Sequence, residues 1–193
     1  YGRAFGVDLT WSGLAYARDT GVAGLARANV ARLPFGDAQF DLVTSFDVLQ
    51  CLVEPDETRA AAEMRRVLRP GGHALIHVSA FDALRGDHSI LSHELHRYSR
   101  GRLRRIVEGT GFELLRLTYT NATLVPVLLL VRSLQRRRGL VTSDQDEVAA
   151  REISIPPAPV NAVLSAALSL EARLARHVNL PFGSSLLCLA RKP

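Results

Sequence analysis

Three polar side chains follow short apolar runs, each at the point where the run ends. Asp8 follows 4–7, Asn29 follows 24–28, and Ser45 follows 40–44. Short apolar runs of this kind predict strands, and an open α/β sheet binds its ligand where the strands end. A carboxylate at such a point can accept two hydrogen bonds from a ribose diol. An amide oxygen such as that of Asn29 can accept one from an adenine amino group.

Each of these residues also has a purely structural explanation. Aspartate is a common helix-capping residue, and asparagine is common in turns. Taken alone, Asp8 and Asn29 therefore fit a cap and a turn as well as a nucleoside site, and both interpretations stay open at this point.

A second group of chemically competent side chains lies in the segment 87–103, which reads DHSILSHELHRYSRGRL. His93 or His96 could deprotonate a hydroxyl or amine acceptor, because an imidazole titrates near neutral pH. The alternative is that Arg97 and Tyr98 anchor the next helix and that the histidines are surface or packing groups.

Alternating strands and helices must position these side chains. Turn, capping and periodicity signals bound each element; Thr10 and Ser99 are candidate helix caps, and the PGG turn after Arg69 ends a helix. The predicted strands are 4–7, 24–28, 40–44, 73–78, 112–120 and 185–190, and the predicted helices are 11–19, 56–68, 99–108, 124–138 and 160–177. Alternation of this kind predicts a parallel sheet covered by helices on both faces. The polar, proline-bearing stretch 139–160 predicts a loop.

Composition bounds the class of protein. At 193 residues, with 47% hydrophobic and 22% charged residues, the chain fits one globular domain, 1–193. Two cysteines, Cys51 and Cys188, give neither a disulfide framework nor a metal-ligand spacing, so we expect a reducing cytoplasm and no bound metal. No apolar run reaches the roughly 18 residues that span a bilayer.

Positive charge is concentrated in one stretch. Residues 97–138 contain ten arginines and two glutamates, about +8, whereas the rest of the chain carries about −3. Such asymmetry indicates an anionic partner, such as a phosphate, a membrane surface or nucleic acid, or else a solvated basic helix face. The stretch lacks interleaved aromatic residues for base stacking, which argues against nucleic acid.

Three segments, in order and spacing, resemble the class I S-adenosylmethionine-dependent methyltransferases. They are GVDLT, ANVARLPFGDAQFDLVTSFDVL and RRVLRPGGHALI, and they are most similar to the small-molecule branch with an LPF, FDLV and LxPGG signature. The resemblance covers about 6–112. It implies a Rossmann-like, mostly parallel sheet with an antiparallel last strand, and methyl transfer from S-adenosylmethionine to an oxygen, nitrogen or carbon of a small-molecule acceptor.

The resemblance also implies roles for single residues. Asp8 matches the ribose-binding acid, Leu9 packs on adenine, and Val30 offers a backbone contact. Ser45 and Phe46 match positions on the methionine side of the cofactor.

The same resemblance places substrate contacts in the loop that carries the histidines. It makes this loop substrate-facing, with Arg97 and Tyr98 as substrate contacts and His93 or His96 as the general base.

The chain departs from the family pattern at three points. Asn29 stands where the family usually has Asp, so the adenine contact loses charge assistance. Cys51 stands where many relatives have His. The glycine-rich loop and the first strand that normally precede Asp8 are absent from these 193 residues, so we expect an N-terminally incomplete domain that binds its cofactor weakly. A catalytically inactive module that uses the fold as a binding or scaffolding surface is the alternative.

The tail resembles the C-terminal insertion of a subgroup of bacterial methyltransferases. Helices within 121–180 would form a helical insertion or cap before the final strand. The segment 124–138, apolar and then basic, could rest on a membrane surface or a lipid-linked phosphate. The preferred interpretation is a cover over the active site or a homodimer surface.

Overall fold

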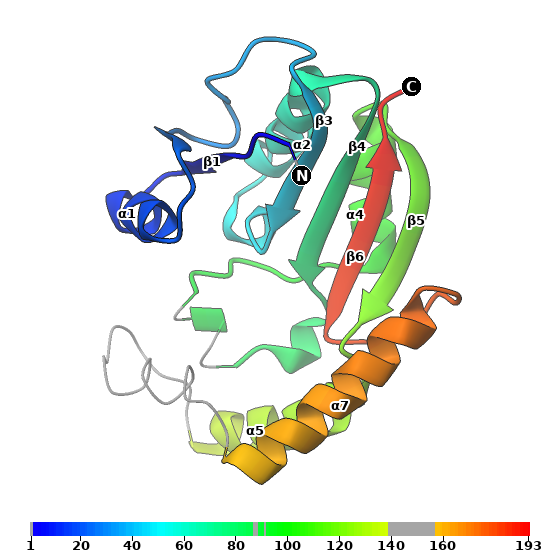
Figure 1. The fold of residues 1–193 in the computed structure, drawn as a ribbon. Helices are drawn as coiled ribbons and strands as arrows, with labels where there is room; N and C mark the ends of the chain where they lie inside the picture. The colour runs from blue at the N-terminus through cyan, green and yellow to red at the C-terminus, as the bar shows by residue number, and fades with distance from the viewer. Residues whose placement is uncertain (1, 87–88, 91, 139–156) are drawn as a thin grey trace.

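The strands of the chain form two sheets. The computed structural model describes residues 2–86, 89–90, 92–138 and 157–193. In a two-stranded sheet, β1 (Phe5–Asp8) pairs in parallel with β2 (Gly24–Arg27). A four-stranded sheet has the order β3 (Phe40–Phe46), β4 (Leu68–Ser79), β6 (Ser185–Arg191) and β5 (Glu113–Thr120) (Figure 1). The predicted mixed α/β fold is confirmed.

Helices alternate with these strands, as the sequence pattern predicted. The α-helices are α1 (Trp11–Asp19), α2 (Asp56–Val67), α4 (Arg100–Gly109), α5 (Val125–Arg138) and α7 (Ala158–Ala175). Short 3-10 turns are η1 (Leu49–Cys51), η2 (Asp82–Leu84) and η3 (Ala122–Leu124). Both predicted caps are confirmed: Thr10 accepts a hydrogen bond from the amide of Gly13, and Ser99 accepts one from the amide of Arg102. Most of the predicted 139–160 loop lies outside the described residues.

The last strand of the chain enters the middle of the larger sheet. β3 pairs in parallel with β4, whereas β6 runs antiparallel to both β4 and β5. The predicted antiparallel last strand is therefore confirmed. Because β6 lies between β4 and β5 rather than at an edge, two of the three ladders in this sheet are antiparallel, and the pairing is less parallel than predicted.

One face of the larger sheet carries the core. Residues of β4 alternate between buried and half-buried, and the buried set packs with α2 and α4, which lie behind the sheet in Figure 1. On the opposite face Leu42 is 54% exposed and Phe46 is 53% exposed. The prediction of helices on both faces is therefore wrong for this sheet in the part of the chain that the structure describes.

The helices α5 and α7 lie across the end of the sheet where β3, β4 and β5 finish (Figure 1). Glu171 on α7 accepts hydrogen bonds from the amides of Ala122 (3.0 Å) and Thr123 (2.8 Å) in η3. Arg116 on β5 donates to the carbonyl of Val178 (2.9 Å), just beyond α7. These bonds hold the C-terminal end of α7 against η3 and β5. Among the described helices, none combines the length and apolar character needed to cross a membrane.

A buried polar cluster joins α2 to α4. Tyr98, only 1% exposed, donates its hydroxyl proton to Glu57, and Arg102 donates to the other Glu57 oxygen at 2.8 Å. Burial alone would raise the pKa of Glu57, but the hydrogen bonds from Tyr98 and Arg102 hold that pKa below its ordinary value of 4.5. The Glu57 carboxylate therefore stabilises the fold in its charged form.

The variant Tyr98→Phe removes one of the hydrogen bonds to this carboxylate. We expect its free energy of unfolding at pH 7 to fall by about 1–3 kcal/mol. A lowered folded-state pKa gives stability that is present above the unfolded pKa and lost as the pH falls through the folded pKa. The deficit should therefore shrink below pH 4.5, as urea unfolding at several pH values would measure.

Tyr16→Phe is the matched control, because Tyr16 is 75% exposed. Its stability should equal that of the wild type at every pH. A Tyr98→Phe deficit that is equally large at pH 3 and pH 7 would show that the lost stability does not come from the Glu57 carboxylate.

Candidate functional site

The predicted nucleoside-binding residues lie at the carboxyl ends of β1 and β2. These ends are adjacent, because the amide of Ala28 donates to the carbonyl of Asp8 at 3.1 Å. The Asp8 carboxylate accepts hydrogen bonds from the amide and hydroxyl of Thr10 at 2.7 and 2.6 Å. The Asn29 side-chain oxygen accepts one from the amide of Ala31 at 2.8 Å. Asp8 thus bonds the capping residue Thr10 and Asn29 makes a turn bond, so both side chains have structural partners, and their cofactor roles stay predictions.

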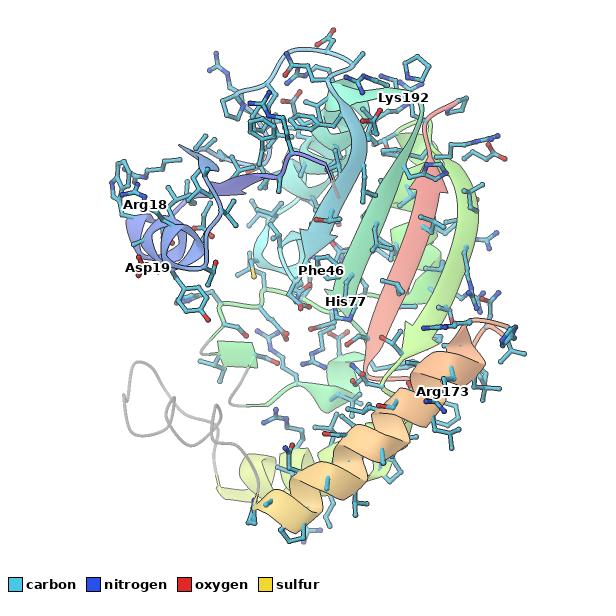
Figure 2. The ribbon with its side chains drawn as sticks, in the orientation of Figure 1. Arg18, Asp19, Phe46, His77, Arg173 and Lys192 are labelled. Carbon is cyan, nitrogen blue, oxygen red and sulfur yellow. The ribbon has the colours of Figure 1, made fainter. Side chains whose placement is uncertain are left out.

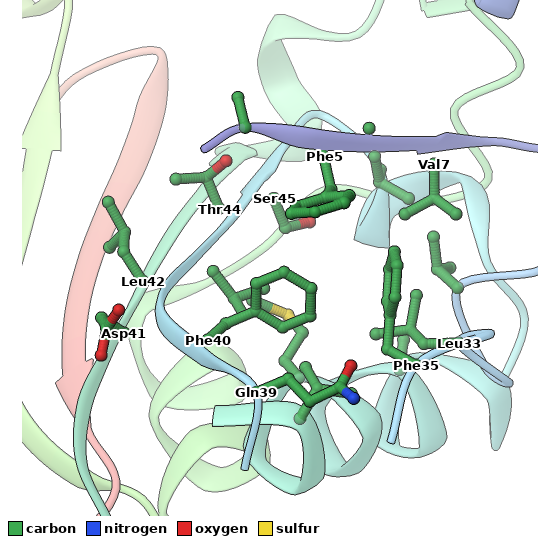
Figure 3. A pocket seen from close by; sticks show the side chains of 18 of the residues that line it. Phe5, Val7, Leu33, Phe35, Gln39, Phe40, Asp41, Leu42, Thr44 and Ser45 are labelled. Atoms are coloured by element: carbon green, nitrogen blue, oxygen red, sulfur yellow. The ribbon is translucent and has the colours of Figure 1, made fainter. Parts of the chain in front are cut away.

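A cavity of about 940 Å³, which we call the interstrand cavity, separates β1 from β3. At one end three aromatic rings, those of Phe5, Phe35 and Phe40, pack edge to face with centroids 4.9–6.1 Å apart (Figure 3). The part of the cavity near the carboxyl ends of β1 and β3 is lined by Val7, Val30, Ser45, Phe46, Val48 and Leu49. Of the predicted cofactor residues, Val30, Ser45 and Phe46 line it. Leu9 lies outside its lining and is 62% exposed.

A second cavity, of about 330 Å³, opens at the ends of β3 and β4. We call it the polar cavity, because Leu84 and Leu128 are the only apolar side chains in its lining. The remaining lining residues are Asp47, Gln50, His77, Ser79, Ser92, Glu94, Arg97, Asn121, Arg132, Ser184 and Ser185. They come from the segment after β3, from β4 and the segment after it, from the turn after β5, from α5, and from the start of β6. This end of the sheet is where an α/β protein gathers its ligand-binding groups.

A continuous chain of hydrogen bonds forms one wall of the polar cavity. Gln50, 2% exposed, donates to Asp47 (3.0 Å) and to the Ser79 hydroxyl (3.2 Å). The Ser79 hydroxyl donates to Glu94 (2.7 Å), which in turn accepts from Arg97 (3.1 Å). Because each of these buried groups has a partner, the wall holds a fixed arrangement of donors and acceptors.

Two residues of this cavity have left-handed backbones. Asp47 has a φ of 57° and Asn121 a φ of 58°. Asp and Asn tolerate this region better than other non-glycine residues, and such conformations gather at ligand sites. The left-handed turn at Asp47 directs its carboxylate toward β4.

His77, near the carboxyl end of β4, forms a pair with Asp47. His77 Nδ1 lies 3.2 Å from Asp47 Oδ1, although the two groups are not aligned as a hydrogen bond. Figure 2 shows Phe46 and His77 side by side at the ends of β3 and β4. A carboxylate beside Nδ1 favours the tautomer that carries its proton there, which leaves Nε2 as a proton acceptor.

The predicted site residues do not include His77, because the candidate bases were taken from the segment 87–103. The available signal was the place of His77 near the end of the predicted strand 73–78; in the structure it pairs with Phe46, two residues beyond the predicted strand 40–44.

The predicted bases and substrate contacts lie in different places. His96 Nε2 is 3.2 Å from Glu57, in the core cluster, and neither His96 nor His93 lines the polar cavity. Arg97 lines this cavity, whereas Tyr98 donates to Glu57 in the core. His88, in the same segment 87–103, lies outside the described residues.

Cys51, which stands where many relatives have His, lies just behind this wall. Burial raises the pKa of its thiol, and the nearby Glu94 and Asp47 carboxylates raise it further. The thiol is thereby kept protonated and a poor nucleophile at neutral pH.

The hydrogen-bonded wall can be tested with Ser79→Ala. The substitution leaves the buried Glu94 and Gln50 groups each short of one partner, so we expect the free energy of unfolding to fall by about 1–3 kcal/mol. Urea unfolding curves measure the change. Ser165→Ala, on the exposed face of α7, is the matched control and should stay within about 0.5 kcal/mol of the wild type. Equal effects of the two substitutions would contradict the role given to Ser79.

Comparison with known proteins finds similarity to methyltransferases over part of the chain. Residues 1–76 match the model of the methyltransferase domain family. A candidate methyltransferase of Encephalitozoon cuniculi is 45% identical over 74 residues, which are 38% of this chain and 35% of that protein. The ubiquinone/menaquinone biosynthesis C-methyltransferase UbiE of Psychromonas ingrahamii is 40% identical over 67 residues, 33% of this chain and 26% of that protein. The matches thus span about a quarter to a third of these curated relatives.

Solved structures match over nearly the whole chain. One comes from a complex between the Trm112 methyltransferase activator of Haloferax volcanii and a candidate methyltransferase (TM-score 0.60, 20% identity, 100% of this chain and 73% of that chain). Another is the [4+2]-cyclase SpnF (TM-score 0.56, 22% identity, 98% of this chain and 65% of that chain). Residues 1–76 therefore carry a methyltransferase domain sequence, and the fold is that of the class I S-adenosylmethionine-dependent methyltransferases, as the motifs predicted.

Proposed function

We propose that this chain catalyses S-adenosylmethionine-dependent methyl transfer to a small-molecule acceptor. The observation that carries the proposal is the arrangement of two cavities on the two sides of one short segment. Phe46, Val48 and Leu49 line the interstrand cavity, whereas Asp47 and Gln50 line the polar cavity. A donor and an acceptor bound in these cavities would both lie against this segment, and methyl transfer needs the methyl donor and the nucleophile to meet in direct contact at its edge.

The residues at the carboxyl end of the interstrand cavity suit the cofactor. Val7 and Val30 supply apolar walls for a base, while Asp8 and Asn29 bring acceptor oxygens to the adjoining strand ends. Leu9, Ser45 and Phe46 complete the predicted set. S-adenosylmethionine, when bound, supplies a methyl group already activated on a sulfonium sulfur, so the protein needs to position the reactants and exclude water.

The acceptor and the setting of the reaction are further parts of the proposal. Because the relative UbiE is named a C-methyltransferase, carbon stays open beside oxygen and nitrogen as the methylated atom. A lipid- or sugar-linked acceptor could approach along α5, where Val127 and Leu130 are exposed, so peripheral membrane contact through 124–138 is retained. Both cysteines are free thiols, in keeping with a reducing cytoplasm.

Protein partners enter the proposal in two forms. The same exposed helix suits a homodimer surface. The Haloferax neighbour was solved in a complex with an activator, which makes a protein activator a second candidate.

A catalytically inactive module is the second candidate function. Asn29 in place of an aspartate favours it. The similar structure of the [4+2]-cyclase SpnF also favours it, because it shows that the fold is not confined to methyltransferases.

The experiment that separates the two functions is calorimetry with S-adenosylhomocysteine. We expect saturable binding to the wild-type chain, and binding roughly 10- to 100-fold weaker in Asp8→Asn, which exchanges a charged acceptor for a neutral one. Asp19→Asn, at the exposed end of α1, is the matched control and should bind like the wild type. No binding to the wild type, or equal binding to all three proteins, would reject the proposed use of this strand end.

A further inference from the structure

We propose that the polar cavity binds a small acceptor that carries an anionic group and, a few bonds away, a hydroxyl or amine. Arg97 and Arg132 would hold the anionic group, such as a carboxylate or phosphate, and His77 would take the proton from the hydroxyl or amine. This inference rests on the proposed function and adds the class of acceptor and the proton-accepting group.

Two guanidinium groups define the anion-binding end of the cavity. Arg132, from α5, is only 8% exposed, and Arg97 faces it from the segment after β4. All three nitrogens of Arg97 make hydrogen bonds, to Glu94 (3.1 Å), Ala80 (3.2 Å) and Ser89 (3.0 Å). The Arg97 guanidinium group is therefore held in one position, and an anion would bind to it there.

Two guanidinium groups that line one cavity can hold the same anion. Burial lowers the pKa of Arg97, the Glu94 carboxylate raises it through its charge and its hydrogen bond, and the positive charge of Arg132 lowers it. An anion with several oxygens can accept hydrogen bonds from both guanidinium groups at once. Carboxylate and phosphate groups have the planar or multiple oxygens that such a pair prefers.

The opposite end of the cavity carries the proton-accepting pair. Asp47 Oδ1 lies 3.2 Å from His77 Nδ1 and also accepts from Gln50, so the carboxylate is held on the Nδ1 side. An acceptor O–H or N–H bond would break with its proton passing to His77 Nε2, while the electron pair stays on the nucleophilic atom. Asp47 acts as a positioning residue in this scheme, because it reaches the acceptor only through His77.

The size and lining of the cavity exclude an apolar acceptor head group. About 330 Å³ is near the lower limit of small-ligand sites. An apolar ring placed here would displace water from a lining that is mostly polar or charged, at a cost that an acid with hydroxyl or amine groups avoids.

The anion-binding end is tested by NMR titration of the chain with inorganic phosphate. We expect binding in the millimolar range, with shifts at the Arg97 and Arg132 side-chain Nε–H groups and at the His77 ring. Arg132→Gln should weaken binding at least fivefold, and Arg132→Lys, which keeps the charge, should weaken it less. Arg104→Gln removes the same charge from an exposed position of α4 and should bind phosphate like the wild type.

The proton-accepting end is tested with a matched pair of probes, butyrate and 3-hydroxybutyrate. These acids have the same charge and chain length and differ in one hydroxyl group. We expect the hydroxy acid to bind the wild type more tightly and to shift the His77 ring more strongly. In His77→Phe the two acids should bind equally, whereas His73→Phe, a control on the same strand outside the cavity, should keep the difference.

Several outcomes would overturn the inference. Equal weakening of phosphate binding by Arg104→Gln and Arg132→Gln would mean that only net charge matters. Equal affinity of the wild type for both acids would remove His77 from the acceptor site. S-adenosylhomocysteine binding is measured on the same samples. Phosphate binding at Arg132 without S-adenosylhomocysteine binding would keep the anion site and reject methyl transfer. S-adenosylhomocysteine binding without phosphate binding at Arg132 would reject only this inference.

Discussion

The position of the segment 46–50 is the constraint on which the rest of the site depends. Two kinds of bond fix it to β4. Phe46 pairs with His77 in the parallel ladder, with the Asp47 amide donating to the His77 carbonyl at 3.0 Å, and the buried Gln50 amide bonds Ser79. A buried amide without partners costs about 1–3 kcal/mol, so these bonds give the segment one strongly preferred position. Because the two cavities share this segment as their common wall, its position also sets the distance between whatever they bind.

The two cavities differ in chemistry in a way that suits the proposed methyl transfer. The interstrand cavity is lined largely by aromatic and aliphatic side chains, whereas the polar cavity is built from buried charged and hydrogen-bonding groups. An adenosyl group would bind in the interstrand cavity and a small acid in the polar cavity, so the two ligands would not compete. The helix α5, whose preceding turn η3 is bonded to Glu171 of α7, contributes Arg132 and Leu128 to the lining of the polar cavity.

Much of the local structure could be predicted because its causes are local. Thr10 and Ser99 cap the helices that follow them, and hydrophobic runs mark each strand to within a few residues. The place of β6 could not be predicted in this way, since its neighbours β4 and β5 are set by pairing across the whole chain. The same limit applies to the histidines: His96 meets a glutamate of α2 some forty residues away, whereas His77 meets Asp47 only once β3 and β4 have paired. Arg132 looked like part of a solvated basic helix, and only its packing over the sheet end buries it.

The central claim is that the segment 46–50 borders a cofactor site on one side and an acceptor site on the other. A crystal structure of the chain with S-adenosylhomocysteine tests it most directly. The account predicts the adenosyl group at the carboxyl ends of β1, β2 and β3, beside Val30 and Ser45, with the sulfur facing the segment 46–50 and the His77 side of the sheet. A cofactor product found in the polar cavity, or on a surface away from these strand ends, would contradict the account.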